Sequence, residues 1–325
     1  MTSSLAATVP GFDGMSSAAT ALLFPGQGSQ HVGMGRHLAA EHPVASAKMA
    51  EADEAIDRSL SRLCFEGPES ELTRTEYCQP AILAVSVALW RALGAESGLQ
   101  PRWLAGHSLG EYTALVVAGA IRFRDAIRLV HLRGRLMQSA VPEGIGTMAA
   151  IVGLEDAVVA ELCAAAAQGE VVSPANFNGA GQVVIAGHRA AVGRVMESAR
   201  AAGGRVIPLA VSAPFHCALM APAAAELTSA LAAIEVAPPR VPIISNVDAV
   251  VNVEASRIRE LLIAQVTAPV RWVESMRLLQ TLGCRRAIEV GPGQVLAKLL
   301  QRMRLGIASE TLEDAGALGS AGARA

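Results

Sequence analysis

The segment Gly106-His107-Ser108-Leu109-Gly110-Glu111 constrains the fold of this chain more than any other. Apolar residues 103–105 precede it, and residues 112–121 read as a mostly apolar helix. A G-x-S-x-G turn between a strand and a helix holds its serine in a strained backbone geometry, and the glycines remove Cβ atoms that would clash. The serine then stands beside the positive end of a helix, which suits a nucleophile. The segment therefore predicts an α/β fold with Ser108 as nucleophile; a plain tight turn is the alternative.

Composition narrows the classes of protein that fit. Of 325 residues, 52% are hydrophobic and 17% charged, which is typical of a globular enzyme and excludes a disordered polymer. The net charge of −2 gives no reason to expect nucleic-acid binding. No apolar run is long enough to span a bilayer, and residues 1–19 lack the Lys or Arg of a secretory signal. The five cysteines form no C-x-x-C pair, so we expect no metal site and a reducing, cytoplasmic environment.

Strand and helix patterns alternate along most of the chain. An apolar strand over 21–24 enters a glycine-flanked loop at 25–30, and helical patterns follow at 44–63 and 79–94 before the serine turn. After residue 212 we expect helices at 217–233 and 270–281, strands at 241–245 and 287–290, and a last helix after Gly291-Pro292-Gly293. The expected domains follow from this alternation. They are a large α/β domain over 20–144 and 212–308, a subdomain over 145–211, and flexible ends at 1–19 and 309–325.

Residues 145–211 show a different order of predicted strands and helices from the rest of the chain. Strands are expected at 147–152, 171–176, 182–186 and 205–210, with helices at 155–168 and 189–202. This β-α-β-β-α-β order is the ferredoxin-like signature. The pattern predicts a small ferredoxin-like subdomain inserted into the larger α/β domain.

A nucleophilic serine needs a base, and His216 is the best candidate of seven histidines. A single histidine is more often structural, but His216 follows Pro214 at a strand end, where active-site residues gather. The side chain of His107 should point away from Ser108 and support the turn. Glu111 should help to start the helix. No third catalytic carboxylate is evident.

Arg133 is the most unusual residue of the expected helix 124–138. At about 100° per residue, Arg124, Arg128 and Arg135 fall on a polar face, whereas Arg133 falls near the centre of the apolar face. An inward arginine is costly unless it meets an anion. The sequence leaves two interpretations of Arg133 open. It forms a buried ion pair with an Asp or Glu, or it binds a substrate carboxylate.

Several motifs together resemble one known family, the malonyl-CoA:acyl-carrier-protein transacylases of fatty acid synthesis and the related acyltransferase domains of polyketide synthases. The resemblance covers about residues 21–305 in the expected order. It is carried by Phe24-Pro25-Gly26-Gln27-Gly28-Ser29-Gln30, Gly106 to Glu111, Arg133 in Arg-Gly-Arg-Leu-Met-Gln, Asn176 to Gly187, Pro214-Phe215-His216, Ser245-Asn246, Gln265, Pro269-Val270-Arg271-Trp272 and Val290-Gly291-Pro292-Gly293. The family fold implies a large α/β-hydrolase-like domain with a ferredoxin-like insert.

The resemblance also implies catalytic roles. Ser108 would accept the acyl group and His216 would act as its general base, in a ping-pong reaction through a malonyl-serine. The backbone N–H groups of Gln27 and Leu109 would form the oxyanion hole. The family orients its histidine with backbone groups, which accounts for the missing third carboxylate.

The same resemblance implies a set of substrate-binding residues. Arg133 would hold the malonyl carboxylate, Gln265 would orient the site near the base, and Asn246 would support it. Leu109 and Phe215 match the malonyl-type pattern. A bulky Phe215 should crowd a 2-methyl branch, a discrimination worth only about 1–3 kcal/mol.

The implied substrates are malonyl-CoA and the phosphopantetheine thiol of an acyl carrier protein, with no cofactor and a monomeric enzyme. Whether fatty acid or polyketide synthesis is served stays open. A thioester hydrolase on the same scaffold would have little use for Arg133, and a non-catalytic scaffold would not need the site residues. Five arginines are candidates for a carrier-protein docking patch, although an ordinary solvated face is preferred: Arg124, Arg128 and Arg135, or Arg285 and Arg286.

Overall fold

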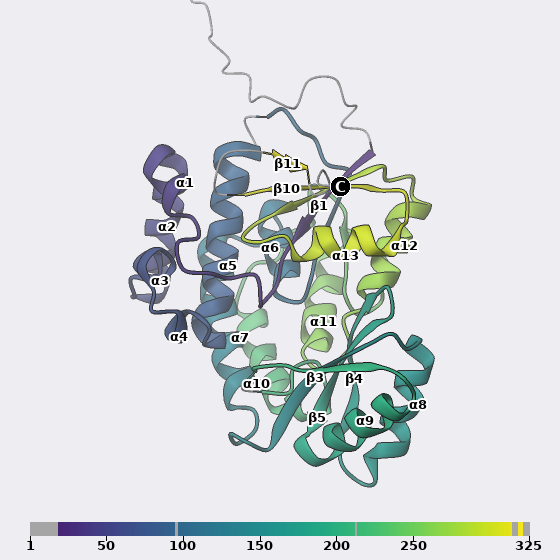
Figure 1. Cartoon of the computed structure of the whole chain (residues 1–325). Coiled ribbons are helices and arrows are strands. Elements are labelled where there is room, and N and C mark those ends of the chain that lie inside the picture. Colours follow the sequence, from purple (N-terminus) through teal and green to yellow (C-terminus); the bar gives the residue numbers. More distant parts are fainter. Residues whose placement is uncertain (1–18, 95–96, 212, 314–317, 321–325) are drawn as a thin grey trace, which may run out of the picture.

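Two β-sheets organise the chain, and the computed structural model describes residues 19–94, 97–211, 213–313 and 318–320 (Figure 1). The larger sheet has the strand order β11-β10-β9-β1-β2-β7-β8. Strands β10 to β7 run parallel, while β11 and β8 pair antiparallel at the edges. The strands are β1 Thr20–Phe24, β2 Trp103–Gly106, β7 Ile243–Ile244, β8 Val251–Asn252, β9 Arg286–Val290, β10 Ala308–Leu312 and β11 Leu318–Ser320.

The central strands are buried on both faces, as their continuous apolar runs predict. Within β1, Leu22 and Phe24 face one hydrophobic cluster, while Ala21 and Leu23 face another on the opposite side of the sheet. The first cluster includes α2 (Pro43–Ile56), α5 (Thr75–Leu89), α6 (Leu109–Val117), α7 (Phe123–Ser139) and α10 (Ala221–Ala232), and the second includes α12 (Trp272–Thr281) and α13 (Val295–Met303). Helices therefore cover both faces of the sheet.

Helices α5 and α7 pack closely beside the sheet. A Cβ added to Gly134 of α7 would lie 2.5 Å from the carbonyl oxygen of Thr75, so a glycine is required at this contact. Helix α5 begins at Thr75, four residues before the predicted start, because Pro80 lies inside the helix rather than in its first turn. The remaining helices are α1 Arg36–Glu41, α3 Leu60–Glu66, α4 Glu69–Leu72, η2 Trp90–Gly94, η3 Ala218–Met220 and α11 Ala255–Gln265.

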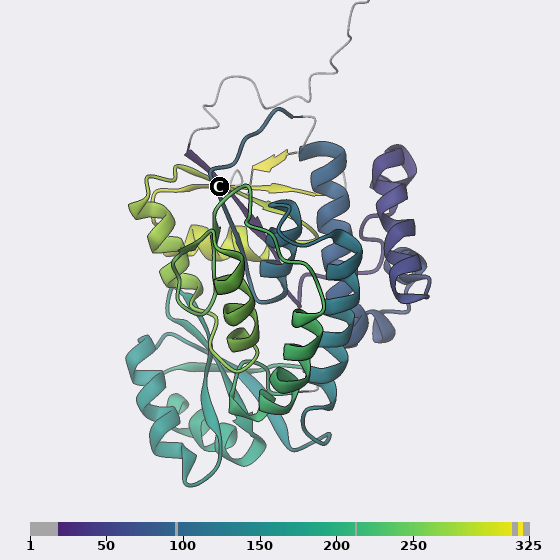
Figure 2. The same ribbon diagram turned by 180° about the vertical axis from the view of Figure 1, so that it is seen from behind.

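The smaller sheet is antiparallel and lies below the large one in Figures 1 and 2. Its strand order is β4-β5-β3-β6, and its elements follow in the chain as β3, α8, β4, β5, α9 and β6. A parallel bridge between Asn176 and Val270 joins β4 to the segment before α12. The elements are β3 Gly146–Val152, α8 Asp156–Ala167, β4 Val172–Gly179, β5 Gln182–His188, α9 Arg189–Ala201 and β6 Arg205–Pro208. The protein is therefore a mixed α/β protein with a parallel-rich sheet and a separate antiparallel sheet.

Two other predicted boundaries also differ from the structure. The flexible tail expected over 309–325 begins too early, because Ala308–Leu312 forms β10 and pairs with β9. The single helix expected over 44–63 is two helices, α2 and α3, since Asp57 adopts a left-handed conformation with φ of 50°. The predicted N-terminal extension, apart from residue 19, and residues 314–317 and 321–325 lie outside the described residues. Among the helices that are described, none is long and apolar enough to cross a lipid bilayer.

Candidate active site

The site lies at the carboxyl ends of three neighbouring parallel strands. Gln27 follows β1, Ser108 follows β2 and Asn246 follows β7, and these strands are adjacent in the sheet. In open α/β sheets, ligands bind at this edge. The sheet order thus brings together residues that are far apart in the sequence.

The predicted strand, turn and helix around Ser108 are present. Ser108 has φ of 51° and ψ of −105°, a conformation that is costly for a residue with a side chain. A Cβ on Gly106 would lie 1.9 Å from the carbonyl carbon of Gly110, and one on Gly110 would lie 1.9 Å from the carbonyl oxygen of Phe24. The two glycines therefore allow the turn to pack against itself and against β1.

The imidazole of His216 lies beside the hydroxyl of Ser108 and is bonded on its other side to a main-chain carbonyl. Its Nε2 is 2.7 Å from Oγ of Ser108, and its Nδ1 is 2.8 Å from the main-chain carbonyl oxygen of Gln265. A carbonyl can only accept, so Nδ1 carries the proton and Nε2 accepts from the hydroxyl. Burial, assisted by the nearby charge of Arg133, lowers the pKa of His216 to about 3. The imidazole is therefore neutral at pH 7 and able to take the serine proton.

Arg133 is 1% exposed, as its place on the apolar face of α7 predicted. Its Nη1 donates to Oε1 of Gln79 at 2.7 Å, and its Nη2 donates to Oε1 of Gln265 at 3.0 Å and to Oγ of Ser108 at 3.2 Å. No carboxylate within the described ranges lies within ion-pair distance of it. Burial lowers its pKa, but an arginine in a protein stays protonated. The ion-pair interpretation is therefore wrong, and a buried cation without a direct counterion lies beside Ser108.

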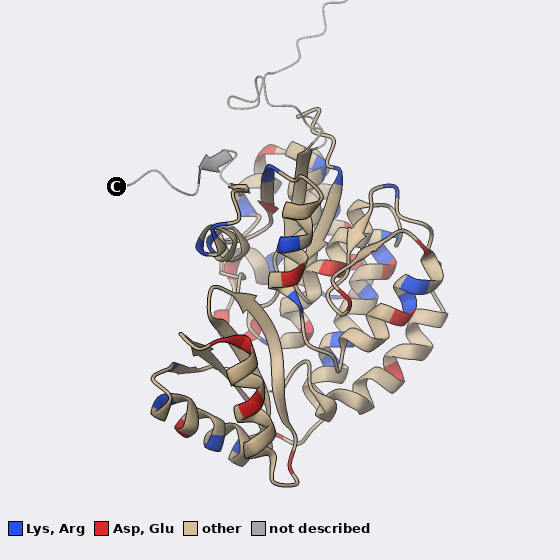
Figure 3. Cartoon of the chain, turned by 90° about the vertical axis from the view of Figure 1, so that its right-hand side faces the viewer, with Lys and Arg blue, Asp and Glu red and all other residues tan. Residues whose placement is uncertain are grey.

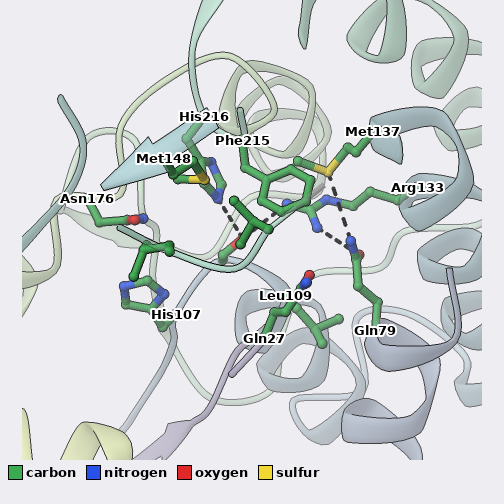
Figure 4. A pocket seen from close by; sticks show the side chains of 13 residues that line it. Gln27, Gln79, His107, Leu109, Arg133, Met137, Met148, Asn176, Phe215 and His216 are labelled. Atoms are coloured by element: carbon green, nitrogen blue, oxygen red, sulfur yellow. Dashed lines mark hydrogen bonds between the residues drawn. The ribbon is translucent and has the colours of Figure 1, made fainter. Parts of the chain in front are cut away.

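A pocket opens over Ser108 (Figure 4). Its lining includes six residues predicted from the sequence, which are Gln27, Ser108, Leu109, Arg133, Phe215 and His216, together with Gln79, His107, Met137, Met148, Asn176, Leu209 and Val211. No hydrogen bond from the backbone N–H of Gln27 or Leu109 is found within the described part of the chain. These two N–H groups are thus available to an oxygen atom held over Ser108.

Gln265 and Asn246 lie behind the pocket rather than in its lining. Asn246 accepts from the Ser108 N–H through Oδ1 at 2.7 Å, and its Nδ2 donates to the carbonyl oxygen of Gly106 at 2.7 Å. Gln265 contacts Ser108, Arg133 and His216 through its side chain and main chain. Both residues therefore act on the site through other residues.

Reasoning from the sequence missed Gln79 and did not foresee that His107 lines the pocket. Gln79 lies in the almost wholly buried helix α5, where a lone amide among apolar residues was a signal that could have been used. The side chain of His107 was expected to point away, yet it lines the pocket without bonding to Ser108. Its Nε2 is 2.9 Å from Oδ1 of Asn178, and its ring packs against Trp272. Burial lowers the pKa of His107.

Glu111 was expected only to help start its helix. It does lie in the first turn of α6, but it is 3% exposed and points inward. Its Oε2 accepts from Nε2 of Gln265 at 2.7 Å and from the N–H of Asn246 at 3.0 Å. Burial raises the pKa of Glu111 to about 7. A buried carboxylate therefore lies behind the site, bonded to its two supporting amides.

The arginines considered for a docking patch do not form one free surface. Arg124 pairs with Glu54, and Nε of Arg128 donates to the carbonyl oxygen of Ala55, so both connect α7 to α2. Arg286 is 5% exposed and pairs with Glu310 of β10, so the expectation that it is exposed was wrong. On the right-hand side of the molecule in Figure 1, Figure 3 shows blue and red segments interspersed. Ion pairs of Arg124 and Arg286 and hydrogen bonds of Arg128 and Arg285 to main-chain carbonyls thus account for most of these residues.

The described residues hold no cluster of three or more His, Cys, Asp or Glu side chains that could bind a metal ion. All five cysteines are buried and free.

Comparisons with known proteins agree with this geometry. The family model described as "Acyl transferase domain" matches residues 21–316. The malonyl CoA-acyl carrier protein transacylase of Salmonella typhimurium is 48% identical over 93% of this chain and 98% of its own length, and the Bacillus subtilis (strain 168) protein of the same name is 46% identical over 87% of this chain and 90% of its own length.

Solved structures give the same result. An acyl carrier protein S-malonyltransferase from Vibrio cholerae is 49% identical, with a TM-score of 0.89 over 91% of this chain and 97% of its own. A malonyl-transacylase solved in complex with a type II PKS acyl-carrier protein is 47% identical, with a TM-score of 0.90 over 92% and 97%. The chain therefore belongs to the acyl transferase domain family, as a member of its malonyl-CoA:acyl-carrier-protein transacylase group, and is an acyltransferase.

Proposed function

We propose that the protein transfers a malonyl group from malonyl-CoA to the phosphopantetheine thiol of an acyl carrier protein. The observation that carries the proposal is Arg133, a buried cation whose Nη2 lies 3.2 Å from Oγ of Ser108 and whose side-chain partners are neutral. Burying a charge without a counterion is costly, so the site favours a ligand that supplies one. A malonyl thioester carries a carboxylate close to its reactive carbonyl. The names of the relatives support the same donor and acceptor.

In the proposed first half-reaction, Oγ of Ser108 attacks the thioester carbonyl while its proton passes to Nε2 of His216. The 2.7 Å contact between the two atoms supports this step. The free N–H groups of Gln27 and Leu109 would stabilise the oxyanion. The C–S bond then breaks, and the CoA sulfur leaves with the proton from His216. A malonyl ester of Ser108 remains.

In the second half-reaction, the carrier-protein thiol gives its proton to His216 and attacks the malonyl ester. The tetrahedral intermediate collapses, the proton returns to Oγ of Ser108, and the malonyl thioester leaves. A groove beside the pocket, bordered by Gln27, His107 and α13, would admit the pantetheine arm. Because CoA leaves before the carrier-protein thiol attacks the malonyl ester, the proposed mechanism is ping-pong.

The carboxylate clamp and the supporting residues complete the proposal. Arg133 would bind the malonyl carboxylate in a bidentate manner. Gln265 would orient the base, Asn246 would support the serine turn, and Phe215 would crowd a 2-methyl branch. No observation on the described residues favours a thioester hydrolase or a non-catalytic scaffold.

We also propose that the two sheets belong to a ferredoxin-like subdomain and an α/β-hydrolase-like large domain. The order β3-α8-β4-β5-α9-β6 with the sheet order β4-β5-β3-β6 supports a ferredoxin-like subdomain. The serine turn between β2 and α6 supports an α/β-hydrolase-like large domain. We also propose that the enzyme is monomeric, requires no cofactor and works in the cytoplasm, where its five free cysteines would stay reduced.

The function is tested by intact mass after brief exposure of the protein to malonyl-, methylmalonyl- and acetyl-CoA in competition. The expected result is a malonyl adduct on the wild type and no adduct on Ser108→Ala. CoA release without a lasting adduct would favour a hydrolase. The absence of both an adduct and CoA release would contradict an enzymatic role.

A further inference from the structure

Glu111 is a buried charged group to which the proposed mechanism gives no task. It lies three residues after Ser108, and its Oε2 accepts from the N–H of Asn246 at 3.0 Å and from Nε2 of Gln265 at 2.7 Å. Within the described residues it forms no ion pair. A carboxylate removed from water depends on such donors. Its contacts therefore indicate what it holds in place.

The first partner, Asn246, holds the nucleophile. Its Oδ1 accepts from the N–H of Ser108 at 2.7 Å, and its Nδ2 donates to the carbonyl oxygen of Gly106 at 2.7 Å. The two bonds bracket the strained serine turn. Because the N–H of Asn246 is bonded to Glu111, the loop after β7 is tied to the first turn of α6.

The second partner, Gln265, holds the base. Its main-chain carbonyl accepts from Nδ1 of His216 at 2.8 Å, and its side-chain Oε1 accepts from Nη2 of Arg133 at 3.0 Å. The Nε2 end of the amide can only donate, so its bond to Glu111 leaves Oε1 facing the guanidinium. A reversed amide would point two N–H donors at Arg133. Glu111 thus selects the orientation of Gln265.

We propose that Glu111 is a positioning residue for acyl transfer, whose Oε2 anchors Asn246 and Gln265 and so holds Ser108 and His216 at hydrogen-bond distance. The inference rests on the proposed roles of Ser108 and His216. A misplacement of about 1 Å costs reactions of this kind about 100-fold in rate. An uncharged acceptor oxygen at the same place should preserve most of the geometry.

The test is the rate constant at which phenylmethanesulfonyl fluoride labels Ser108, followed by intact mass and peptide mapping. This probe has no carboxylate, so its reaction does not use the clamp of Arg133. Glu111→Leu removes the acceptor and should slow both this labelling and malonyl-serine formation by about 100-fold. Glu111→Gln keeps an acceptor oxygen and should remain within about tenfold of the wild type. A slower reaction with malonyl-CoA alone would overturn the proposal.

Glu289 provides the matched control. It is also fully buried, its Oε2 accepts from the N–H of Ala297 at 2.8 Å, and burial raises its pKa to about 7, as for Glu111. It does not line the pocket, so Glu289→Gln should label at the wild-type rate per folded molecule. If Ser108 of Glu111→Leu were labelled at the wild-type rate, the positioning role of Glu111 would be overturned, while the proposed function would stand. Labelling of the protein that persists at the wild-type rate in Ser108→Ala would instead overturn the proposed nucleophile.

A second variant covers the case in which Glu111→Leu does not fold. Gln265→Met removes the other end of the same hydrogen bond but keeps the main-chain carbonyl that accepts from His216. Labelling by the neutral probe should slow by at least about tenfold. Labelling of this variant at the wild-type rate would contradict the anchoring role.

Discussion

Replacing Arg133 by methionine should change which acyl group the enzyme accepts. Methionine is unbranched and apolar, so it can fill the space without a buried charge. The guanidinium offers a carboxylate two charge-assisted hydrogen bonds, and each is worth about 1.5–3 kcal/mol. A loss of about 3 kcal/mol corresponds to a fall of roughly 150-fold in kcat/KM for malonyl-CoA. Acetyl-CoA has no carboxylate and loses none of this binding energy.

The contact between Nη2 of Arg133 and Oγ of Ser108, at 3.2 Å, sets the expected effect on acetyl-CoA. One such hydrogen bond is worth about 1 kcal/mol, so acylation by acetyl-CoA should change by about fivefold at most. Selectivity for malonyl over acetyl should therefore fall by roughly 30-fold or more. The assay is the ratio of malonyl- to acetyl-serine after rapid quenching of a mixture of the two thioesters.

Arg128 offers a matched control on the same helix. It lies on the exposed face of α7, and its Nε donates to a main-chain carbonyl of α2. Arg128→Met should leave the ratio of the two adducts unchanged. An unchanged ratio in Arg133→Met would refute the carboxylate clamp, because it would mean that the buried charge does not contribute to substrate choice.

Three further predictions concern the base, the turn and the acyl pocket. Because burial lowers the pKa of His216 to about 3, the base stays neutral as the pH falls. In Glu111→Gln, which removes the nearby carboxyl whose pKa is about 7, the acylation rate should therefore be flat from pH 8 to about 5, and a loss centred near 6.5 in this variant would contradict the neutral base. Gly110→Ala would place a Cβ 1.9 Å from Phe24 and should destabilise the fold by about 3 kcal/mol in denaturant titration, whereas Gly193→Ala, with no atom within 4 Å, should not destabilise it. Phe215→Ala should lower the preference for malonyl over methylmalonyl by about tenfold in the same competition assay, and an unchanged preference would exclude the steric role.

The parts of the site that could be predicted from the sequence are those with a local signal. The glycines around Ser108 and the helical period that turns Arg133 inward can both be seen within a few residues, and both agree with the structure. The position of His216 after a strand also pointed to the site. The oxyanion-hole and substrate-binding roles of the other residues came from the family resemblance.

The remaining features depend on contacts between distant residues. Glu111 resembles any acidic residue in a first helical turn, and only the fold brings Asn246 and Gln265 to it. The sequence of β10 is short and partly polar and does not by itself predict a strand, because the strand is defined by its pairing with β9. The burial of Arg286 likewise follows from that pairing.

The most direct test of the central claim is a chase of the isolated malonyl-enzyme with phosphopantetheinylated acyl carrier protein. We predict that the malonyl mass moves from Ser108 to the carrier-protein thiol, and that the ester persists when buffer or the unmodified carrier protein is added instead. Release of free malonate at the same rate with or without the thiol would contradict acyl transfer and identify the protein as a hydrolase.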